Sequence, residues 1–517
     1  FTSQSYLLFF LTYFLLRHIL ARGQSYWDIS SKVLLAIGIF SMVLIAYQLT
    51  QTYLNEGLGG KAIYKVIGHS GHKNLAASYL FLLFGFAVYF ALAGKKQSWY
   101  YWLIGVKLIL MLLLRSRAVY VAVAAFTATS FLFYAFSQVQ LKQLVFRRVL
   151  PFALVVGLFG ALFVGNTGAG KDYVKYLDPT TYLRSVSGGE RLFVWYKTMN
   201  LVQEKPILGY GTGNWKLQFP SKNIEGGFRL MEKDLVFTRV HNDFLEVLAE
   251  TGILGLLFYL SIFVLAIVGL FKSMWQEGKT LNRANVILLA TVVGYMLIAF
   301  FDFPKERPEH QVLLALLIAA SATKGAAFFQ SQKLYFQPSK ARLKLIIAAF
   351  TCFWLLNLPI CYYRSVADLS SEKIMVGMVI KDAQLMRDNA QKAHSDWSNL
   401  NVMVIPYKWY EGLSYYFEEK YQQAVRPFEE AFRLNPYNFN VLNNYASTLV
   451  QLKRYPEAIP LYLGAIEINP KFEEGMFNLA FSYYQLKQYQ EALRWVNKVQ
   501  VNLEKKAIFL KQIQAAM

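Results

Sequence analysis

Residues 239–272 read RVHNDFLEVLAETGILGLLFYLSIFVLAIVGLFK, and this stretch joins the two features that decide the fold. Its second part, residues 253–272, is apolar almost throughout and is long enough to cross a hydrocarbon layer of about 30 Å. Its first part is polar and contains a histidine and three acidic residues. The stretch therefore predicts a membrane helix that follows a polar segment at one membrane surface.

The composition of the whole chain points the same way. Of 517 residues, 55% are hydrophobic and only 16% are charged, whereas soluble globular proteins carry about 25% charged residues. The net charge is +21, but residues 364–517 hold 18 Lys/Arg against 16 Asp/Glu, so most of the excess lies among the earlier apolar runs. Basic residues in such places are typical of the loops of a polytopic membrane protein. This distribution excludes a wholly soluble enzyme and a partner nucleic acid.

Ten apolar runs are candidates for membrane spans: about 5–21, 33–50, 75–94, 98–114, 118–137, 149–165, 253–272, 284–301, 309–322 and 343–363. If they alternate in direction, one set of connections holds 15 Lys/Arg and the other short set holds 7. The positive-inside rule places the richer set in the cytoplasm. We therefore expect a multi-pass protein of the bacterial inner membrane, with the loop 166–252 and all residues after 363 in the periplasm. Because the chain is apolar from Phe1, we expect its native N-terminus to lie upstream.

The last part of the sequence repeats with a period of 34 residues. The repeated positions are Tyr421, Tyr455 and Tyr489; Ala424, Ala458 and Ala492; Gly412, Ala446 and Ala480; and Pro436 and Pro470. This period, with small residues at helix contacts, resembles tetratricopeptide repeats, which are stacked helical hairpins. The predicted fold is all-α: a polytopic transmembrane helical bundle over 1–363, a helical linker over 364–404 and an α-solenoid of tetratricopeptide repeats over 405–517.

Polar motifs surround the predicted periplasmic loop. An Arg-x-x-x-Trp pair occupies 191–195, KPILGYGTGNW occupies 205–215, and HNDFLEVLAETGILG occupies 241–255. SRAVY at 116–120 and GHKNL at 71–75 flank apolar runs on the same predicted face. In this order the segments, over about residues 60–325, are similar to the O-antigen ligase and polymerase superfamily.

The resemblance implies a glycosyltransferase whose donor is a glycan on undecaprenyl diphosphate, and which needs neither a metal nor another cofactor. The first expectation for the acceptor is lipid A-core, as in O-antigen ligases. Protein O-oligosaccharyltransferase and O-antigen polymerase activities stay open as alternatives. A hypothesis of another class is a polysaccharide transporter or scaffold, in which the spans move a polymer and the repeats gather protein partners. In either case the spans contact membrane lipid.

The residue types suit this chemistry. A departing diphosphate develops negative charge that fixed cations stabilise, and a guanidinium binds phosphate oxygens in pairs. The candidates for the diphosphate site are Arg117, Arg191, Arg239, Arg307 and Arg115. His241 is the predicted general base, because a neutral imidazole accepts a proton near neutral pH. His241, Arg117 and Arg191 are therefore the predicted catalytic residues.

Other residues receive secondary predictions. Candidate sugar or acceptor contacts are Asn214, Trp195, Trp215, Asn242 and His72. The glycines at 209, 211 and 213 predict a tight turn rather than a dinucleotide site, because no βαβ pattern surrounds them. Glu250, nine residues after His241, should point away from it along a helix and serve packing. Lys107 lies within an apolar run, where it either lines a donor cavity or reaches a polar neighbour.

Overall fold

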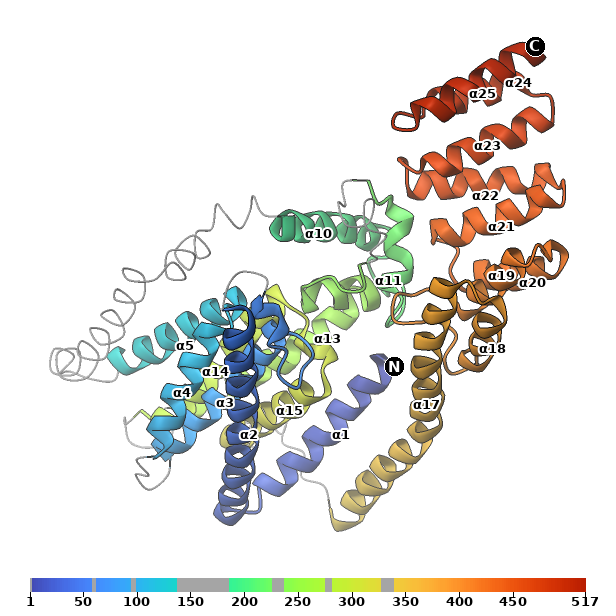
Figure 1. The fold of residues 1–517 in the computed structure, drawn as a ribbon. Helices are drawn as coiled ribbons and strands as arrows, with labels where there is room; N and C mark the ends of the chain where they lie inside the picture. Colours follow the sequence, from blue (N-terminus) through green and yellow to red (C-terminus); the bar gives the residue numbers. More distant parts are fainter. Residues whose placement is uncertain are drawn as a thin grey trace, which may run out of the picture. The chain divides into compact units, whose positions relative to one another are not determined.

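The computed structural model describes residues 2–57, 62–93, 99–136, 186–225, 237–274, 281–326 and 339–517, and these residues are almost entirely helical (Figure 1). The chain divides into two compact units. The first comprises Phe1–Leu192, Lys205–Gly213 and Arg239–Phe350, and the second comprises Phe193–Glu204, Asn214–Thr238 and Thr351–Met517. The predicted span 149–165 lies outside the described residues.

The first unit is a bundle of apolar helices. Its helices are α1 (Thr2–Leu20), α2 (Gln24–Glu56), α3 (Lys73–Ala93), α4 (Trp99–Leu113), α5 (Arg117–Phe136), α13 (Asp243–Ser273), α14 (Arg283–Phe301), α15 (Pro308–Lys324) and the start of α17 (Lys340–Ile380). Two short 3₁₀ helices, η1 (Ala62–Lys65) and η4 (Pro304–Glu306), also belong to it. Within the described ranges, α2, α3, α5, α13, α14 and α17 are long and apolar enough to span a membrane. The predicted all-α multi-pass fold is therefore confirmed.

Helices α3 and α14 form the centre of this bundle. Most of α3 is buried, and α14 packs against α3, α5 and α13. Small residues allow the two central helices to approach closely: a methyl group on Gly85 of α3 would lie 2.4 Å from the Thr291 hydroxyl of α14. The outer helices expose large side chains such as Phe40, Trp102 and Phe258. This apolar surface suits contact with lipid. The small residues, in contrast, lie between helices, where they allow close packing.

Helix α13 is broken at Gly252, where the backbone turns to φ 67°. The break leaves helical carbonyl and amide groups without partners in their own helix. A turn formed by residues 206–211 provides them: the Tyr210 and Gly211 amides donate to the carbonyls of Ala249 (3.1 Å) and Glu250 (2.8 Å), and the Ile253 amide donates to the Pro206 carbonyl. This arrangement satisfies the backbone at the point where the polar first part of α13 meets its apolar second part.

Glycine is required on both sides of this contact. Gly209, Gly211 and Gly213 all have positive φ, which confirms the tight turn predicted there. A methyl group on Gly209 would lie 2.4 Å from the Glu250 carbonyl carbon, and one on Gly252 would lie 2.0 Å from the Ile207 carbonyl oxygen. The two glycine motifs of the sequence are therefore partners in one structural joint.

We expect Gly252→Ala to lower the unfolding free energy by at least about 2 kcal/mol, because it adds a backbone overlap to a strained φ. Thermal unfolding of the purified protein in detergent measures this change. Gly105→Ala is the matched control, because a methyl group at Gly105 in α4 meets no atom within 4 Å. An unchanged unfolding temperature for Gly252→Ala would show that the joint is not needed for stability.

The second unit contains the helical repeats. Its helices are the second part of α10 (Val186–Glu204), α11 (Trp215–Gln218), the 3₁₀ helix η3 (Phe219–Lys222), α18 (Ala383–Ala393), α19 (Tyr407–Phe417), α20 (Tyr421–Leu434), α21 (Phe439–Gln451), α22 (Tyr455–Ile468), α23 (Glu473–Gln485), α24 (Tyr489–Asn497) and α25 (Leu503–Ala516). Glu419, Lys453 and Lys487, spaced by 34, all take left-handed φ near 60° where one helix of a hairpin ends. The predicted 34-residue period is therefore a period of backbone geometry.

The solenoid begins earlier than predicted. Helix α17 continues without a break past residue 363, and its residues Ala367 and Ile374 share an apolar core with Met386 of α18 and Phe428 of α20. The segment 364–404 is thus packed into the solenoid rather than serving as a linker. The sequence did not indicate this, because the small and apolar residues of α18 do not follow the 34-residue period.

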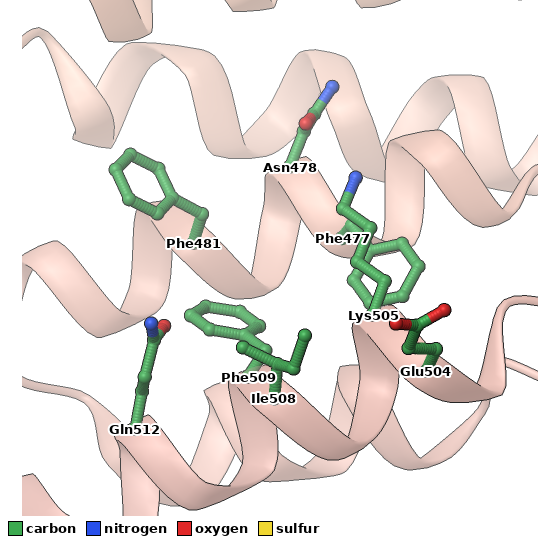
Figure 2. Close-up of a pocket in the computed structure, with 8 residues that line it drawn as sticks. All are labelled: Phe477, Asn478, Phe481, Glu504, Lys505, Ile508, Phe509 and Gln512. Atoms are coloured by element: carbon green, nitrogen blue, oxygen red, sulfur yellow. The ribbon is translucent and has the colours of Figure 1, made fainter.

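A cavity of about 420 Å³ opens between α23 and α25 at the C-terminal end of the solenoid (Figure 2). Its lining is largely apolar and consists of Phe477, Asn478, Phe481, Glu504, Lys505, Ile508, Phe509 and Gln512. The Lys505 ammonium lies 4.5 Å from the centre of the Phe477 ring. The cavity in the repeats is therefore lined by aromatic side chains and a few polar groups.

Candidate active site

Several helix ends meet at one end of the first unit. The starts of α3, α5, α13 and α15 lie there together with the ends of α4 and α14, because successive helices run in opposite directions. Hydrogen bonds and ion pairs connect these ends to one another. Most of the residues predicted to act on the donor are therefore gathered in one region of the bundle.

His241 lies against a buried carboxylate. Its backbone has a left-handed φ of 57°, and the next residue, Asn242, caps α13 by accepting the Leu245 amide at 3.0 Å. The Nδ1 atom of His241 is 3.8 Å from Oδ1 of Asp302, and the imidazole ring meets the Phe303 ring edge-on at 5.0 Å. The His241 side chain is 34% exposed, whereas that of Asp302 is only 3% exposed. This geometry leaves Nε2 of His241 as the ring nitrogen available to a substrate.

Asp302 remains ionised despite its burial. Burial alone would raise the pKa of this carboxyl, but hydrogen bonding with His241 and the charge of the Arg191 guanidinium outweigh that effect and hold the pKa below its usual value. Its position at the end of α14 is fixed, because the Asp302 amide donates to the Ile298 carbonyl at 2.8 Å. A fixed carboxylate of this kind orients an imidazole and stabilises its protonated form.

Arg191 is anchored to the same helix end. Its Nη1 atom donates to the carbonyl of Phe301 at 2.8 Å. This contact uses one of the five donors of the guanidinium. Arg191 is thus held near Asp302 by the end of α14.

A second set of cations surrounds Lys73 at the start of α3. The guanidiniums of Arg115, Arg117 and Arg191 repel the Lys73 ammonium electrostatically. The Asp302 carboxylate attracts it. Lys73 is almost fully buried. Cationic side chains of α3, α5, α10 and the turn between α4 and α5 therefore lie near one another in this part of the described structure.

His72 joins this cationic region to the His241–Asp302 pair. Its Nδ1 accepts the Asn74 amide at 3.2 Å, so the neutral ring carries its proton on Nε2. Burial lowers the pKa of His72, the Asp302 charge opposes this shift, and the charges of Lys73 and His241 add to it. Burial thus favours the neutral form of His72.

Next to this region lies a network in which the charges are balanced. Arg239 forms an ion pair with Glu306, and the Lys305 ammonium lies 2.6 Å from Oε1 of Glu246. The Lys305 amide also donates to Oδ2 of Asp243 at 3.0 Å. Burial and the neighbouring Glu246 raise the pKa of Glu306 to about 7. Arg239, which was predicted for the diphosphate site, therefore lies in this network with Glu306 as its ion-pair partner.

The other predicted residues fall into different surroundings. Arg115 is buried and has a φ of 51° at the turn between α4 and α5. Arg307 precedes α15 and is partly exposed, and none of its described contacts joins it to His241. Asn242 is buried as a helix cap, so the role of acceptor contact predicted for it is replaced by capping. Glu250 is buried, in agreement with a packing role.

Three residues predicted to contact sugar or acceptor belong to the second unit. Trp215 is only 2% exposed, and its Nε1 donates to the Thr198 hydroxyl at 3.0 Å. Its predicted role in sugar stacking is therefore corrected, because a buried indole presents no free face. Trp195 is partly exposed on α10 and Asn214 is exposed before α11.

Two residues of the site were missed by the sequence analysis. The charged segment 302–310 attracted attention, but nothing in it singled out Asp302 as the partner of a histidine about sixty residues earlier. Lys73 resembled an ordinary basic residue at the start of a helix. The roles of Asp302 and Lys73 depend on contacts between helices that are distant in the sequence.

The opposite end of the bundle also contains cations. A cavity of about 440 Å³ there is lined by Arg283 at the start of α14 and Lys324 at the end of α15. The Lys324 ammonium lies 4.6 Å from the Trp27 ring. In the described residues this end has no histidine–carboxylate pair like that of His241 and Asp302.

Parts of the chain match known families. Residues 99–260 match the family described as O-antigen ligase, and residues 411–472 and 461–494 match two tetratricopeptide repeat families. The chain is therefore similar to O-antigen ligases over residues 99–260 and to tetratricopeptide repeats over residues 411–494. The matched ligase segment contains Arg117, Arg191 and His241, whereas Lys73 and Asp302 lie outside it.

Individual relatives cover only parts of the chain. A Rickettsia conorii protein named as a polysaccharide ligase is 30% identical over 124 residues, which are 23% of this chain and 27% of that protein. The ComP-specific O-oligosaccharyltransferase of Acinetobacter baylyi is 23% identical over 240 residues, 46% of this chain and 38% of the relative. The chain thus spans less than two fifths of the length of these relatives.

A solved structure of MamA (AMB-1) is 27% identical over 27% of this chain and 75% of MamA, with a TM-score of 0.22. A score this low supports no argument about the fold. The repeats of the O-antigen ligase-like chain are therefore assigned from their sequence match and from their own helical geometry.

The lowered pKa of His72 leads to a test by pH. The unfolded chain binds a proton at this imidazole below about pH 6.5, whereas the folded chain resists it, so acidification favours unfolding. We expect the unfolding temperature of the wild type to fall, relative to His72→Gln, as the pH decreases from 7.5 to 5.5. The burial of a neutral His72 would be contradicted if the unfolding temperature of the wild type, relative to that of His72→Gln, stayed constant or rose on acidification.

Proposed function

We propose that the protein is a membrane glycosyltransferase that moves an oligo- or polysaccharide from undecaprenyl diphosphate to the hydroxyl group of an acceptor. The observation that carries the proposal is the His241–Asp302 pair with the Arg191 guanidinium held at the same helix end. The guanidinium would bind a phosphate oxygen of the donor, and the neighbouring base would activate the acceptor. The match of residues 99–260 to O-antigen ligases supports the same activity.

The cations would act on the leaving group. When the bond between the anomeric carbon and the phosphate oxygen breaks, the diphosphate leaves with the electron pair and gains negative charge. Arg191 and Arg117 would stabilise this charge with paired hydrogen bonds, an effect that is large where water is excluded. Interactions that strengthen as the charge develops lower the barrier of the transfer step.

His241 would act on the acceptor. Its Nε2 takes the proton of the acceptor hydroxyl while the oxygen of that hydroxyl attacks the anomeric carbon from the side opposite the diphosphate. Asp302, facing Nδ1, stabilises the imidazolium that forms. A single displacement of this kind inverts the configuration at the anomeric carbon and needs no group beyond these residues.

The proposed acceptor is lipid A-core, as in O-antigen ligases, and the proposed location of the site and the repeats is the periplasmic side of the inner membrane. The charge distribution supports this orientation, because the other face has the richer set of basic loops. A protein acceptor is the second candidate. It is favoured by the likeness to an O-oligosaccharyltransferase and by the repeats, which are suited to protein partners.

The products that accumulate separate these acceptors. Membranes that lack a ligase accumulate lipid-linked polymer, those that lack an oligosaccharyltransferase contain unmodified acceptor protein, and those that lack a polymerase accumulate single repeat units. Analysis of glycolipids and glycoproteins from a strain without this protein therefore identifies the activity. An unchanged set of all three products would contradict a transferase.

His241→Ala should reduce the rate of glycan transfer by about 10²–10⁴-fold, the usual contribution of a general base. Transfer is measured with purified protein and lipid-linked donor, and the thermal unfolding temperature shows whether the fold is retained. A transporter or scaffold would keep its function in this variant. Wild-type transfer by a folded His241→Ala protein would therefore rule out the proposed base.

Arg117→Lys should weaken the apparent donor affinity by about tenfold or more, because the charge is kept but the paired contact is lost. The control is Arg283→Lys at the opposite end of the bundle, which should leave the affinity unchanged. Equal effects of the two substitutions would indicate a general effect of charge or stability. No effect of either would remove Arg117 from the donor site.

A further inference from the structure

Lys73 makes three hydrogen bonds at the start of α3. Its Nζ donates to Oδ1 of Asn74 at 3.3 Å, to the carbonyl of Leu114 at 3.2 Å and to the carbonyl of Arg115 at 2.9 Å. An ammonium group has three donors and no acceptor. All three donors are therefore engaged by the protein, and this lysine has none left for a phosphate oxygen.

Two of these bonds close the end of α4. The last carbonyls of a helix have no partner within the helix, and near the end of α4 those of Leu114 and Arg115 are reached by a side chain from another helix. The same turn leads into α5, which begins with Arg117. Lys73 thus fixes a short connection that carries two guanidiniums.

The turn needs such support. Arg115 has a φ of 51°, a conformation that costs a residue with a side chain of the order of 1 kcal/mol. Three guanidiniums act on the buried Lys73 ammonium, and like charges brought together oppose folding. An apolar side chain at this position would avoid that repulsion, so the lysine is explained better by the conformation it imposes than by overall stability.

We propose that Lys73 is a positioning residue, which holds the turn 114–116 in the conformation that presents Arg115 and Arg117 to the anionic part of the donor. This role rests on the proposed function, and it assigns to Lys73 no direct contact with the substrate. The first consequence is that loss of the three hydrogen bonds weakens donor binding through the arginines.

The test measures binding of farnesyl diphosphate to the purified full chain in detergent. Lys73→Met keeps the length of the side chain but removes its donors, and it should weaken binding at least tenfold. Lys73→Gln, which retains an amide donor without the charge, should bind more tightly than Lys73→Met. The control is Lys65→Met, which removes an exposed lysine of η1 that is paired with Glu56 and should bind within twofold of the wild type.

A double-mutant cycle separates positioning from a general loss of structure. On an Arg115→Gln/Arg117→Gln background, Lys73→Met should weaken binding by less than a further twofold, because its effect passes through these two arginines. Independent, multiplying effects would overturn the proposal, as would binding within twofold of the wild type for Lys73→Met. If Lys73→Met does not fold, Lys73→Gln takes its place in the cycle with the same expectations.

The outcomes also distinguish this inference from the function on which it rests. If Arg117→Gln and Arg191→Gln both bind farnesyl diphosphate as the wild type does, the proposed donor site itself is wrong. If these two variants lose binding and Lys73→Met does not, only the positioning role is wrong.

Discussion

Positive charge gathered in a partly buried space costs free energy unless an anion is present, and the candidate active site is arranged around this constraint. The buried Lys73 ammonium is repelled electrostatically by Arg115, Arg117 and Arg191. The Asp302 carboxylate attracts it. Ordinary packing does not require such a concentration. A lipid-carried diphosphate, with its several negative charges, is the kind of partner for which the concentration is useful.

The neighbouring network shows how the chain treats charges that serve only its own structure. There Arg239 and Lys305 face Glu306, Glu246 and Asp243, so that cations are matched by acids. This network fixes the segment between α14 and α15 against the start of α13. As a result Asp302 and His241, which come from these two places, face each other. The ion pairs of this network hold the helix ends, and the proposed function assigns the transfer chemistry to His241, Arg117 and Arg191.

Much of the fold could be predicted from local sequence. Apolar runs predicted the helices of the first unit to within a few residues, except where α2, α13 and α17 extend well beyond the run, and the 34-residue spacing indicated the repeats. Arg117 could be singled out because it borders such a run, and His241 because of the HND motif that contains it. What could not be predicted depends on contacts between distant segments. The joint of Gly209 with Gly252, the pairing of His241 with Asp302 and the hydrogen bonds of Lys73 are of this kind. Trp215 shows the opposite error, since an indole beside a motif suggested sugar contact until its burial was known.

The central claim is that the cationic end of the bundle, and not the opposite end, binds the diphosphate of the donor. A density map of the protein in lipid nanodiscs with undecaprenyl diphosphate tests it most directly. The account predicts diphosphate density within hydrogen-bonding distance of the guanidiniums of Arg117 and Arg191, with His241 facing the position of the sugar. Diphosphate density beside Arg283 and Lys324, at the other end of α14, would contradict it.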